Sequence, residues 1–346
     1  WGWKPAFGRR CMRELMALLA PVLAFAVAWG VTRVCCRPGS WLYFLDQPNA
    51  RSLHVTPTPR TGGVGVMAGL LAGGVLVGVG GLGDLPLGAA LAGAGGLALV
   101  GLADDRVGLS ARLRLLAQVL VAGGYLALLG TSGAWLEVLA LGVGLVWMGN
   151  LYNFMDGSDG LAGGMALFGF SAFAVAAALA GEEGLALVSA GVAAAAAGFL
   201  VFNFHPARIF MGDAGSVPLG FLAGALGLAG RESGAWPLWF PLLVFAPFIL
   251  DATVTLLRRA LRGERVWEAH RTHYYQRLVQ MGLGHRRTAL LAYALMAGSG
   301  VGAVLALSVG FSLQCVIITM CVFLHLVLGY RIDTAWRRHR IGAQTP

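Results

Sequence analysis

The chain has 346 residues, of which 58% are hydrophobic and only 12% are charged, and its mean hydropathy is +0.74. A soluble domain carries roughly twice this charged fraction, so the composition excludes an ordinary water-soluble protein. The formal charge of +9 comes almost entirely from arginine, because Lys4 is the only lysine. On a membrane protein such an excess reports topology and anionic head groups rather than nucleic-acid binding.

Apolar stretches of about 20 residues recur along the chain, and this is the length that an α-helix needs to cross a bilayer. The short alternating segments of a β-barrel do not occur. The sequence therefore predicts an all-α, polytopic membrane helical bundle that forms a single integral-membrane domain over residues 1–346. In chain order, about eleven predicted spans cover residues 15–34, 62–82, 86–103, 113–130, 135–150, 161–180, 184–202, 215–230, 237–257, 289–309 and 311–330.

Long polar connectors alternate with short ones between these spans. The long connectors and their helix ends hold all but five of the 25 basic residues, the exceptions being Lys4, Arg9, Arg10, Arg13 and Arg231. The positive-inside rule then predicts that the long connectors are cytoplasmic. The four basic residues near the N-terminus favour the opposite orientation. The long connectors hold more basic residues, so we place the long connectors on the cytoplasmic side. Most of the acidic residues also lie on the side of the long connectors. Asp251 is the main ionisable residue inside a predicted span.

The first long connector contains the stretch DQPNARSLHVTPTPRTGGVG, residues 46–65. Its prolines favour a stiff, non-helical segment that can lie against a site, with Arg60 near its end. Two alternatives exist for Gly62 and Gly63: their backbone approaches a phosphate, or it packs closely against a neighbouring helix.

Carboxylates follow several of the predicted spans on the same side of the membrane. Asp104 and Asp105 end the span 86–103, where adjacent acids repel each other unless a cation offsets them. The stretch NLYNFMDGSDG, residues 150–160, then sets Asp156 and Asp159 between two apolar runs, with Asn153 just before them. On their own, the acids of the first pair could simply be a helix end exposed to water.

The stretch NFHPARIFMGDAGS, residues 203–216, adds a further acid, Asp213, together with Asn203 and Phe210. Asp213 could instead cap the following helix, and Phe210 could be a core aromatic. The last long connector reads AHRTH at residues 269–273 and supplies His270, Arg271 and His273, which could also form a solvated basic loop touching anionic lipid.

Together these side chains suit a hard, oxygen-binding cation. Mg²⁺ usually takes one or two carboxylates, keeps waters and binds phosphate oxygens. Histidines such as His205 could be ligands, although a histidine in a polar loop more often makes a hydrogen bond. Phosphoryl transfer requires mainly positioning and charge neutralisation, which carboxylates, arginines and amides can supply. The residues therefore predict a magnesium-dependent phosphoryl-transfer site.

The order of these loops resembles the polyprenyl-phosphate N-acetylhexosamine-1-phosphate transferase family, glycosyltransferase family 4. The resemblance covers nearly the whole chain and includes the motifs D-x-P-N-x-R-x-x-H…P-R-x-G-G, D-D, N-x-x-N-F-x-D-G-x-D-G-L-A-G-G, N-F-x-P-A-x-I-F-M-G-D-x-G-S and A-H-R-x-H. It implies a bundle of ten or eleven membrane helices with a cytoplasmic active site. It also implies transfer of a sugar 1-phosphate from a UDP-sugar to a polyprenyl phosphate, with Mg²⁺ required and Mn²⁺ as an alternative ion.

The resemblance also implies a role for each matching residue. Asp104 would be the catalytic carboxylate next to the acceptor phosphate, as base or orienter, and Asp105 would support the metal–phosphate cluster. Asp159 and Asp213 would hold Mg²⁺ on the donor diphosphate. The nucleotide- and substrate-binding residues would be Asn153, Asp156, Asn203, Phe210 (stacked on uracil), His270, Arg271, His273 and Arg60. In this division Asp159 is a metal ligand, whereas Asp156 faces the nucleotide.

Tyr274, Tyr275 and Gln276 follow His273, where relatives specific for UDP-GlcNAc often carry a second histidine. This sequence and the PTPR of the first connector look more like the branch that initiates O-antigen or related surface-polysaccharide synthesis. The expected function is transfer of N-acetylhexosamine 1-phosphate from a UDP-sugar to undecaprenyl phosphate in the bacterial inner membrane, with a homodimer left open. The alternatives are the phospho-N-acetylmuramoyl-pentapeptide transferase of peptidoglycan synthesis, a secondary transporter and a structural membrane scaffold.

Overall fold

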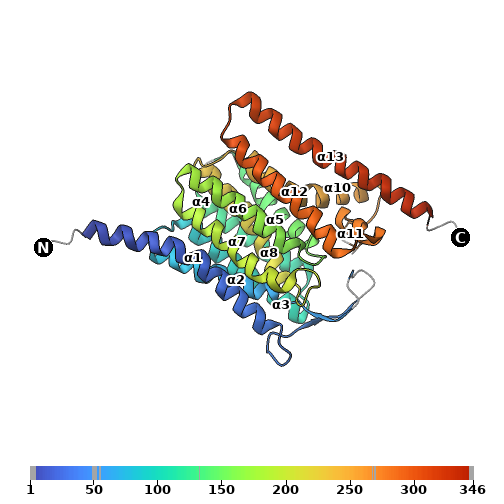
Figure 1. Ribbon diagram of the computed structural model, residues 1–346, viewed down its shortest axis with the longest axis horizontal. Helices are drawn as coiled ribbons and strands as arrows, with labels where there is room; N and C mark the ends of the chain where they lie inside the picture. Colours follow the sequence, from blue (N-terminus) through green and yellow to red (C-terminus); the bar gives the residue numbers. More distant parts are fainter. Residues whose placement is uncertain are drawn as a thin grey trace.

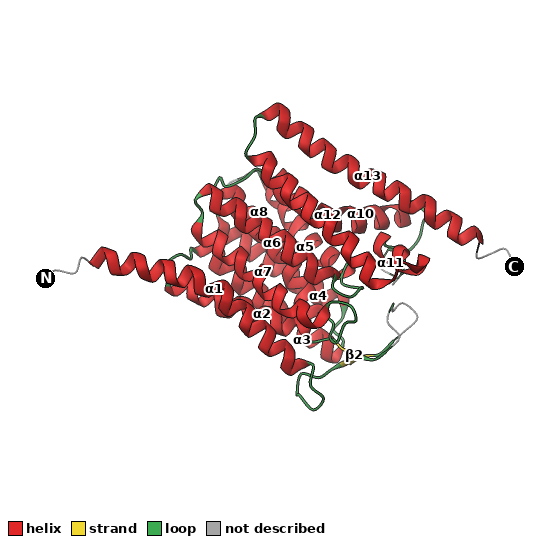
Figure 2. Cartoon of the chain, in the orientation of Figure 1, coloured by secondary structure: helices red, strands yellow, loops and turns green. Residues whose placement is uncertain are grey.

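The computed structural model describes residues 5–48, 53, 56–131, 133–266, 268 and 270–342. These residues form a bundle of helices with one small two-stranded sheet (Figure 2). The long helices are α1 (Pro5–Cys35), α2 (Gly62–Val79), α3 (Leu85–Val107), α4 (Ala111–Leu129), α5 (Trp135–Phe154), α6 (Leu161–Ala180), α7 (Glu183–Asn203), α8 (Asp213–Glu232), α12 (Gly284–Leu307) and α13 (Phe311–Gly342).

Shorter elements complete the chain at the ends of these helices. They are β1 (Leu45–Asp46), β2 (Thr58–Pro59), α9 (Trp239–Val244), α10 (Ala246–Leu261), α11 (Tyr274–Leu278) and the π-helical turn η1 (Val279–Leu283). The two strands pair antiparallel, with Leu45 opposite Pro59. This sheet and α11 lie at the same end of the bundle (Figures 1 and 2).

The prediction of an all-α polytopic bundle is confirmed. Within the described residues, nine helices are long and apolar enough to cross a membrane, and they match nine of the predicted spans. The predicted span 237–257 is instead divided into α9 and α10 at Phe245. Pro247 explains the break, because proline has no N–H to donate to the carbonyl four residues earlier.

The remaining predicted span, 215–230, becomes the central helix α8. This helix packs against α3 and α5, and nearly all of its side chains are buried. By contrast, α13 lies along the outside of the bundle beside α12 (Figure 1), and many of its apolar side chains are exposed. This exposure is what a helix facing lipid requires.

Glycines allow the segment before α8 to approach its neighbours very closely. The backbone N–H groups of Gly62 and Gly63 donate to the carbonyl oxygens of Phe210 and Met211 at 2.9 and 2.8 Å. A Cβ on Gly63 would lie 2.2 Å from the backbone nitrogen of Gly215. Of the two interpretations of the Gly62–Gly63 pair, close packing is therefore confirmed, and these N–H groups hold the start of α8 in place.

The same close approach predicts a selective effect of mutation in α3. A Cβ on Gly101 would lie 2.4 Å from the carbonyl oxygen of Asp213, whereas a Cβ on Gly96 would meet nothing within 4 Å. Gly101→Ala should lower the free energy of unfolding by roughly 1–3 kcal/mol through overpacking, while Gly96→Ala should leave it unchanged or raise it slightly. Thermal unfolding of both variants in detergent checks this, and equal behaviour of the two would contradict it.

Candidate active site

A cavity of about 640 Å³ lies where α3 and α5 end and α8 begins. Its lining includes every side chain expected from the sequence except Asp104 and Arg271. The lining side chains from that set are Asp105, Asp159, Asp213, Asn153, Asp156, Asn203, Phe210, His270, His273 and Arg60. The loops that carry the sequence motifs therefore meet at one place, at the end of an apolar bundle.

Asp105 connects the end of α3 to the start of α8. Its side chain is buried, and its Oδ2 atom accepts a hydrogen bond from the backbone N–H of Ala214 at 3.2 Å. Arg60 donates to the backbone carbonyl of Asp105, and its Nε atom lies 3.7 Å from the Asp105 carboxylate. These contacts make Asp105 a residue that holds the acid cluster together as well as one that lines the cavity.

Arg114 lies between two of the acids, and its place in the site was not predicted from the sequence. Its Nη1 atom is 2.9 Å from the Asp104 carboxylate and 3.3 Å from that of Asp213. Asp104 also accepts a hydrogen bond of 2.6 Å from the backbone N–H of Leu109. The signal in the sequence was an arginine in the first turn of the helix that follows the acid pair.

Asp156, in the turn between α5 and α6, belongs to the same group of acids. Burial raises its pKa well above the ordinary value, and the negative charges of Asp213 and Asp105 raise it further. Asn153 stands beside this group, because its Oδ1 atom accepts a hydrogen bond of 3.2 Å from the Ser216 hydroxyl. The charges of Asp213 and Asp105 therefore act on Asp156, and added positive charge here would be stabilising.

Asp159 lies in a second cluster, where histidines surround it. Its Oδ2 atom is 2.6 Å from Nδ1 of His205 and accepts from the backbone N–H of Ala207 at 3.1 Å. His285 lies on the other side, with Nδ1 3.9 Å from Oδ1 of Asp159 and 2.8 Å from the Ser158 hydroxyl. The two imidazole rings stack at a centroid distance of 5.7 Å.

Asp156, on which the charge of Asp213 acts, therefore groups with Asp213, whereas Asp159 groups with the two histidines. The assignment of Asp159 as a metal ligand stays a prediction. His285 was missed in the sequence, where its only signal was a position just before the predicted span 289–309.

Asn203 fixes the loops around this second cluster. Its side-chain oxygen accepts from the backbone N–H of Gly160 at 3.0 Å, and its side-chain nitrogen donates to the Ile209 carbonyl at 2.9 Å. Phe210, also expected at the nucleotide, is half-buried and lines the cavity. The backbone N–H of Phe210 donates a hydrogen bond of 2.7 Å to the carbonyl oxygen of Pro59, and this bond holds the backbone of Phe210 in place.

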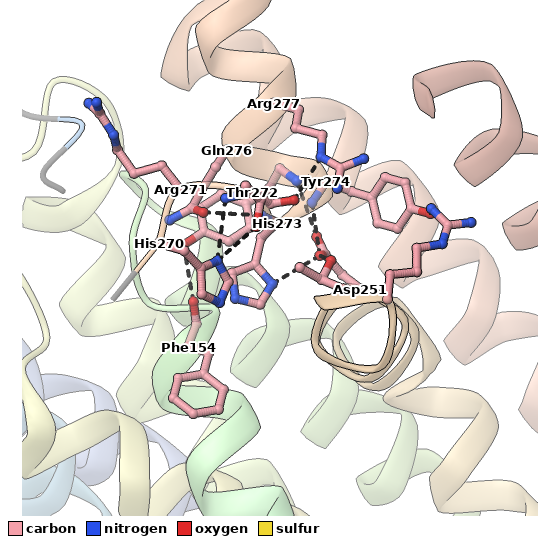
Figure 3. Close-up of polar contacts among 12 residues, drawn as sticks. Phe154, Asp251, His270, Arg271, Thr272, His273, Tyr274, Gln276 and Arg277 are labelled. Carbon is pink, nitrogen blue, oxygen red and sulfur yellow. Dashed lines mark hydrogen bonds and ion pairs between the residues drawn. The ribbon is translucent and has the colours of Figure 1, made fainter. Parts of the chain in front are cut away.

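The AHRTH segment contributes two of its three expected side chains to the cavity. His273 is buried and His270 is half-buried, and both line the cavity. Burial and the neighbouring His273 lower the pKa of His270 to about 4, so this ring is neutral near pH 7. Arg271 is exposed and extends away from the histidines (Figure 3).

The oxygen donors of the first cluster fit a hard divalent cation. In the described part of the chain, no three His, Cys, Asp or Glu side chains converge closely enough to hold a metal ion on their own. Mg²⁺ does not require such a set, because it commonly takes one or two carboxylates and completes its shell with water and substrate phosphate. Asp213 and Asp156, with the amide of Asn153 nearby, offer this kind of partial site.

Known proteins are similar to this chain over the part that carries the acids. The model of the family described as "Glycosyl transferase family 4" matches residues 87–231, which include all five of the acids expected in the site. A Yersinia pestis undecaprenyl-phosphate α-N-acetylglucosaminyl 1-phosphate transferase is 30% identical over 85% of each chain. A probable undecaprenyl-phosphate N-acetylglucosaminyl 1-phosphate transferase of Bacillus subtilis is 29% identical over 83% of each chain.

A third relative extends the similarity over almost the whole sequence. The decaprenyl-phosphate N-acetylglucosaminephosphotransferase of Mycolicibacterium smegmatis is 29% identical over 97% of this chain and 92% of its own. The acid cluster at the end of an apolar bundle and the extent of these matches lead to one conclusion. The chain belongs to glycosyl transferase family 4, the polyprenyl-phosphate N-acetylhexosamine-1-phosphate transferases.

Proposed function

We propose that this protein transfers N-acetylglucosamine 1-phosphate from UDP-N-acetylglucosamine to undecaprenyl phosphate. The products are undecaprenyl-diphosphate-N-acetylglucosamine and UMP. The observation that carries the proposal is the cluster of Asp104, Asp105, Asp156 and Asp213 at a cavity where membrane helices end. The names of the relatives support N-acetylglucosamine over the other N-acetylhexosamines and over the muramoyl-pentapeptide donor.

Asp213 and Asp156 are the side chains that we propose hold Mg²⁺. When bound, Mg²⁺ would neutralise charge on the donor diphosphate and on the departing UMP. Arg114 supplies further positive charge at the same place, because its guanidinium group contacts both Asp104 and Asp213. Bidentate contacts from such an arginine suit phosphate oxygens.

Asp104 acts on the acceptor in this proposal. Its carboxylate orients the undecaprenyl phosphate and takes a proton from it where one is present. An acceptor phosphate oxygen then attacks the β-phosphorus of the donor, and the bond from that phosphorus to the bridging oxygen breaks as UMP leaves. One in-line displacement needs only positioning and charge neutralisation, so we favour it over a covalent intermediate on Asp104.

The remaining cavity residues bind the nucleotide. Phe210 offers a ring face for uracil, and Asn153 and Asn203 fix the surrounding loops. Asp159 with His205 and His285 adds hydrogen-bonding groups at the same end. The arginines of the long connectors support a site on the cytoplasmic face of the bacterial inner membrane, where the polyprenyl phosphate reaches it from the bilayer. Such a product fits the initiating step of a cell-surface polysaccharide.

The reaction is tested with purified protein, undecaprenyl phosphate and a panel of UDP-sugars, followed by mass spectrometry of the lipid product. We expect UDP-N-acetylglucosamine to give the diphosphate-linked lipid and UMP. Asp104→Asn and Asp213→Asn should each lower turnover by roughly 100-fold or more, the scale of losing a preorganised electrostatic group. Glu137→Gln is the matched control, because Glu137 pairs with Arg231 and does not line the cavity. Turnover near wild type in both acid variants would refute the proposed site.

The geometry also predicts distinct effects for the two acids of the Asn153–Gly160 turn. Asp156→Asn should raise the Mg²⁺ concentration needed for half-maximal activity by roughly tenfold or more, because Asp156 is proposed to hold Mg²⁺ together with Asp213. Asp159→Asn should instead raise the KM for the UDP-sugar, with a smaller change in Mg²⁺ dependence. Titrations of Mg²⁺ and of donor on both variants measure this, and the opposite pattern would restore Asp159 as the metal ligand.

A further inference from the structure

Asp251 is a buried carboxylate on α10 at the AHRTH segment, and its side chain is only 9% exposed. Its Oδ1 atom accepts from the backbone N–H of Tyr274 at 2.9 Å, and its Oδ2 atom accepts from that of Tyr275 at 3.1 Å. Oδ1 also lies 3.2 Å from Nδ1 of His273 (Figure 3). One carboxylate therefore holds both the start of α11 and the ring that precedes it.

The His273 ring is fixed on its remaining sides by aromatic neighbours. It stacks on Phe154 at a centroid distance of 6.3 Å and on Tyr275 at 5.9 Å. The backbone N–H of His273 donates to Oε1 of Gln276. His273 is 3% exposed and still lines the cavity, so little of the ring other than its cavity edge meets solvent.

The contact with Asp251 also determines which ring nitrogen of His273 carries a proton. An ionised carboxylate only accepts hydrogen bonds, so the nitrogen that faces it must carry a proton. Nδ1 of His273 is then the donor, and Nε2 is left for a partner in the cavity. When Nδ1 of an imidazole carries the proton, Nε2 is an acceptor, and this role matches a hydroxyl group of a sugar.

A second acid anchors α11 from the side away from the cavity. Asp333 on α13 contacts Nη1 of Arg258 at 2.6 Å and Nη1 of Arg277 at 2.8 Å. It also accepts from the Tyr274 hydroxyl at 3.2 Å. These contacts of Asp333 already hold α11 against α10 and α13. The contact of Asp251 with the imidazole ring is therefore not required to keep α11 in place.

We propose that Asp251 is a positioning residue for His273, which it orients so that Nε2 accepts a hydrogen bond from a hydroxyl group of the donor nucleotide-sugar. The inference rests on the proposed function, since that function supplies the nucleotide-sugar. Asp251 itself touches no substrate. It acts through His273, in the same way that a carboxylate fixes the tautomer and the orientation of an imidazole in other active sites.

Four variants of the full-length protein separate this role from simple anchoring: Asp251→Asn, His273→Asn, the double variant of both, and Asp333→Asn. Asparagine at position 273 can still donate to Asp251 but loses the nitrogen that faces the cavity. Each of the first two should lower kcat/KM for the UDP-sugar by roughly 10- to 100-fold, with the KM for undecaprenyl phosphate little changed.

The kcat/KM of the double variant should be no lower than that of the less active single variant, because both substitutions remove the same interaction. Asp333→Asn is the matched control, an acid-to-amide change on the other side of α11. It should lower the unfolding temperature while kcat/KM stays within about threefold of wild type. Multiplying losses in the double variant, or equal losses from Asp251→Asn and Asp333→Asn, would overturn the proposal.

A failure of the proposed function can be distinguished from a failure of the proposed role of Asp251. If the wild-type protein made no lipid-linked sugar, the proposed function would be refuted. The pairing of Asp251 with His273 would then be tested by the unfolding temperatures of the same variants. Contact between the two side chains predicts that their effects on unfolding are not additive, and strict additivity would overturn the pairing.

Discussion

Repulsion among carboxylates at the end of an apolar bundle is the constraint on which this site depends. Asp105 and Asp213 come close because α3 meets the start of α8 at Gly101, where no side chain intervenes. Buried charges of one sign are unfavourable unless cations offset them. Arg60 and Arg114 offset part of this charge. The packing of the bundle thereby creates a place where additional positive charge is stabilising.

The cavity has chemically different ends, and this division suits a nucleotide-sugar. Acids and Arg114 gather at the end formed by α3 and α8, while Asp159 and His285 lie at the starts of α6 and α12 and His205 lies just after α7. His273 belongs to a third wall that α10 and α13 hold in position. A donor has an anionic diphosphate between a base and a sugar. Placing its diphosphate at the acids leaves hydrogen-bonding groups for the neutral ends, which is the arrangement that phosphoryl transfer requires.

Much of this could be predicted from the sequence, because apolar length predicts membrane helices and arginine predicts their orientation. The acids were found because polar residues between apolar runs stand out. What the sequence could not provide was the grouping of these residues. Asp156 and Asp159 are three residues apart, yet the turn directs one toward Asp213 and the other toward His205. Only tertiary packing decides between these neighbours.

The residues that were missed share a physical reason. Arg114, His285 and Asp251 each act through a partner that is distant in the chain, at separations of 99, 127 and 22 residues. An arginine in a basic connector, a histidine before a span and an acid within a span carry no local sign of those partners. The break between α9 and α10 was also missed, although Pro247 was visible, because kinked and broken helices have the same hydropathy.

In the proposed mechanism the acid cluster and the nucleotide form one cation-dependent site. Thermal unfolding of the purified protein with Mg²⁺, with UMP and with both tests it most directly. We expect UMP to raise the unfolding temperature strongly only when Mg²⁺ is present, and we expect Asp213→Asn to abolish this joint effect. Equal protection by UMP in the presence of a chelator would contradict it, as would protection that survives in Asp213→Asn.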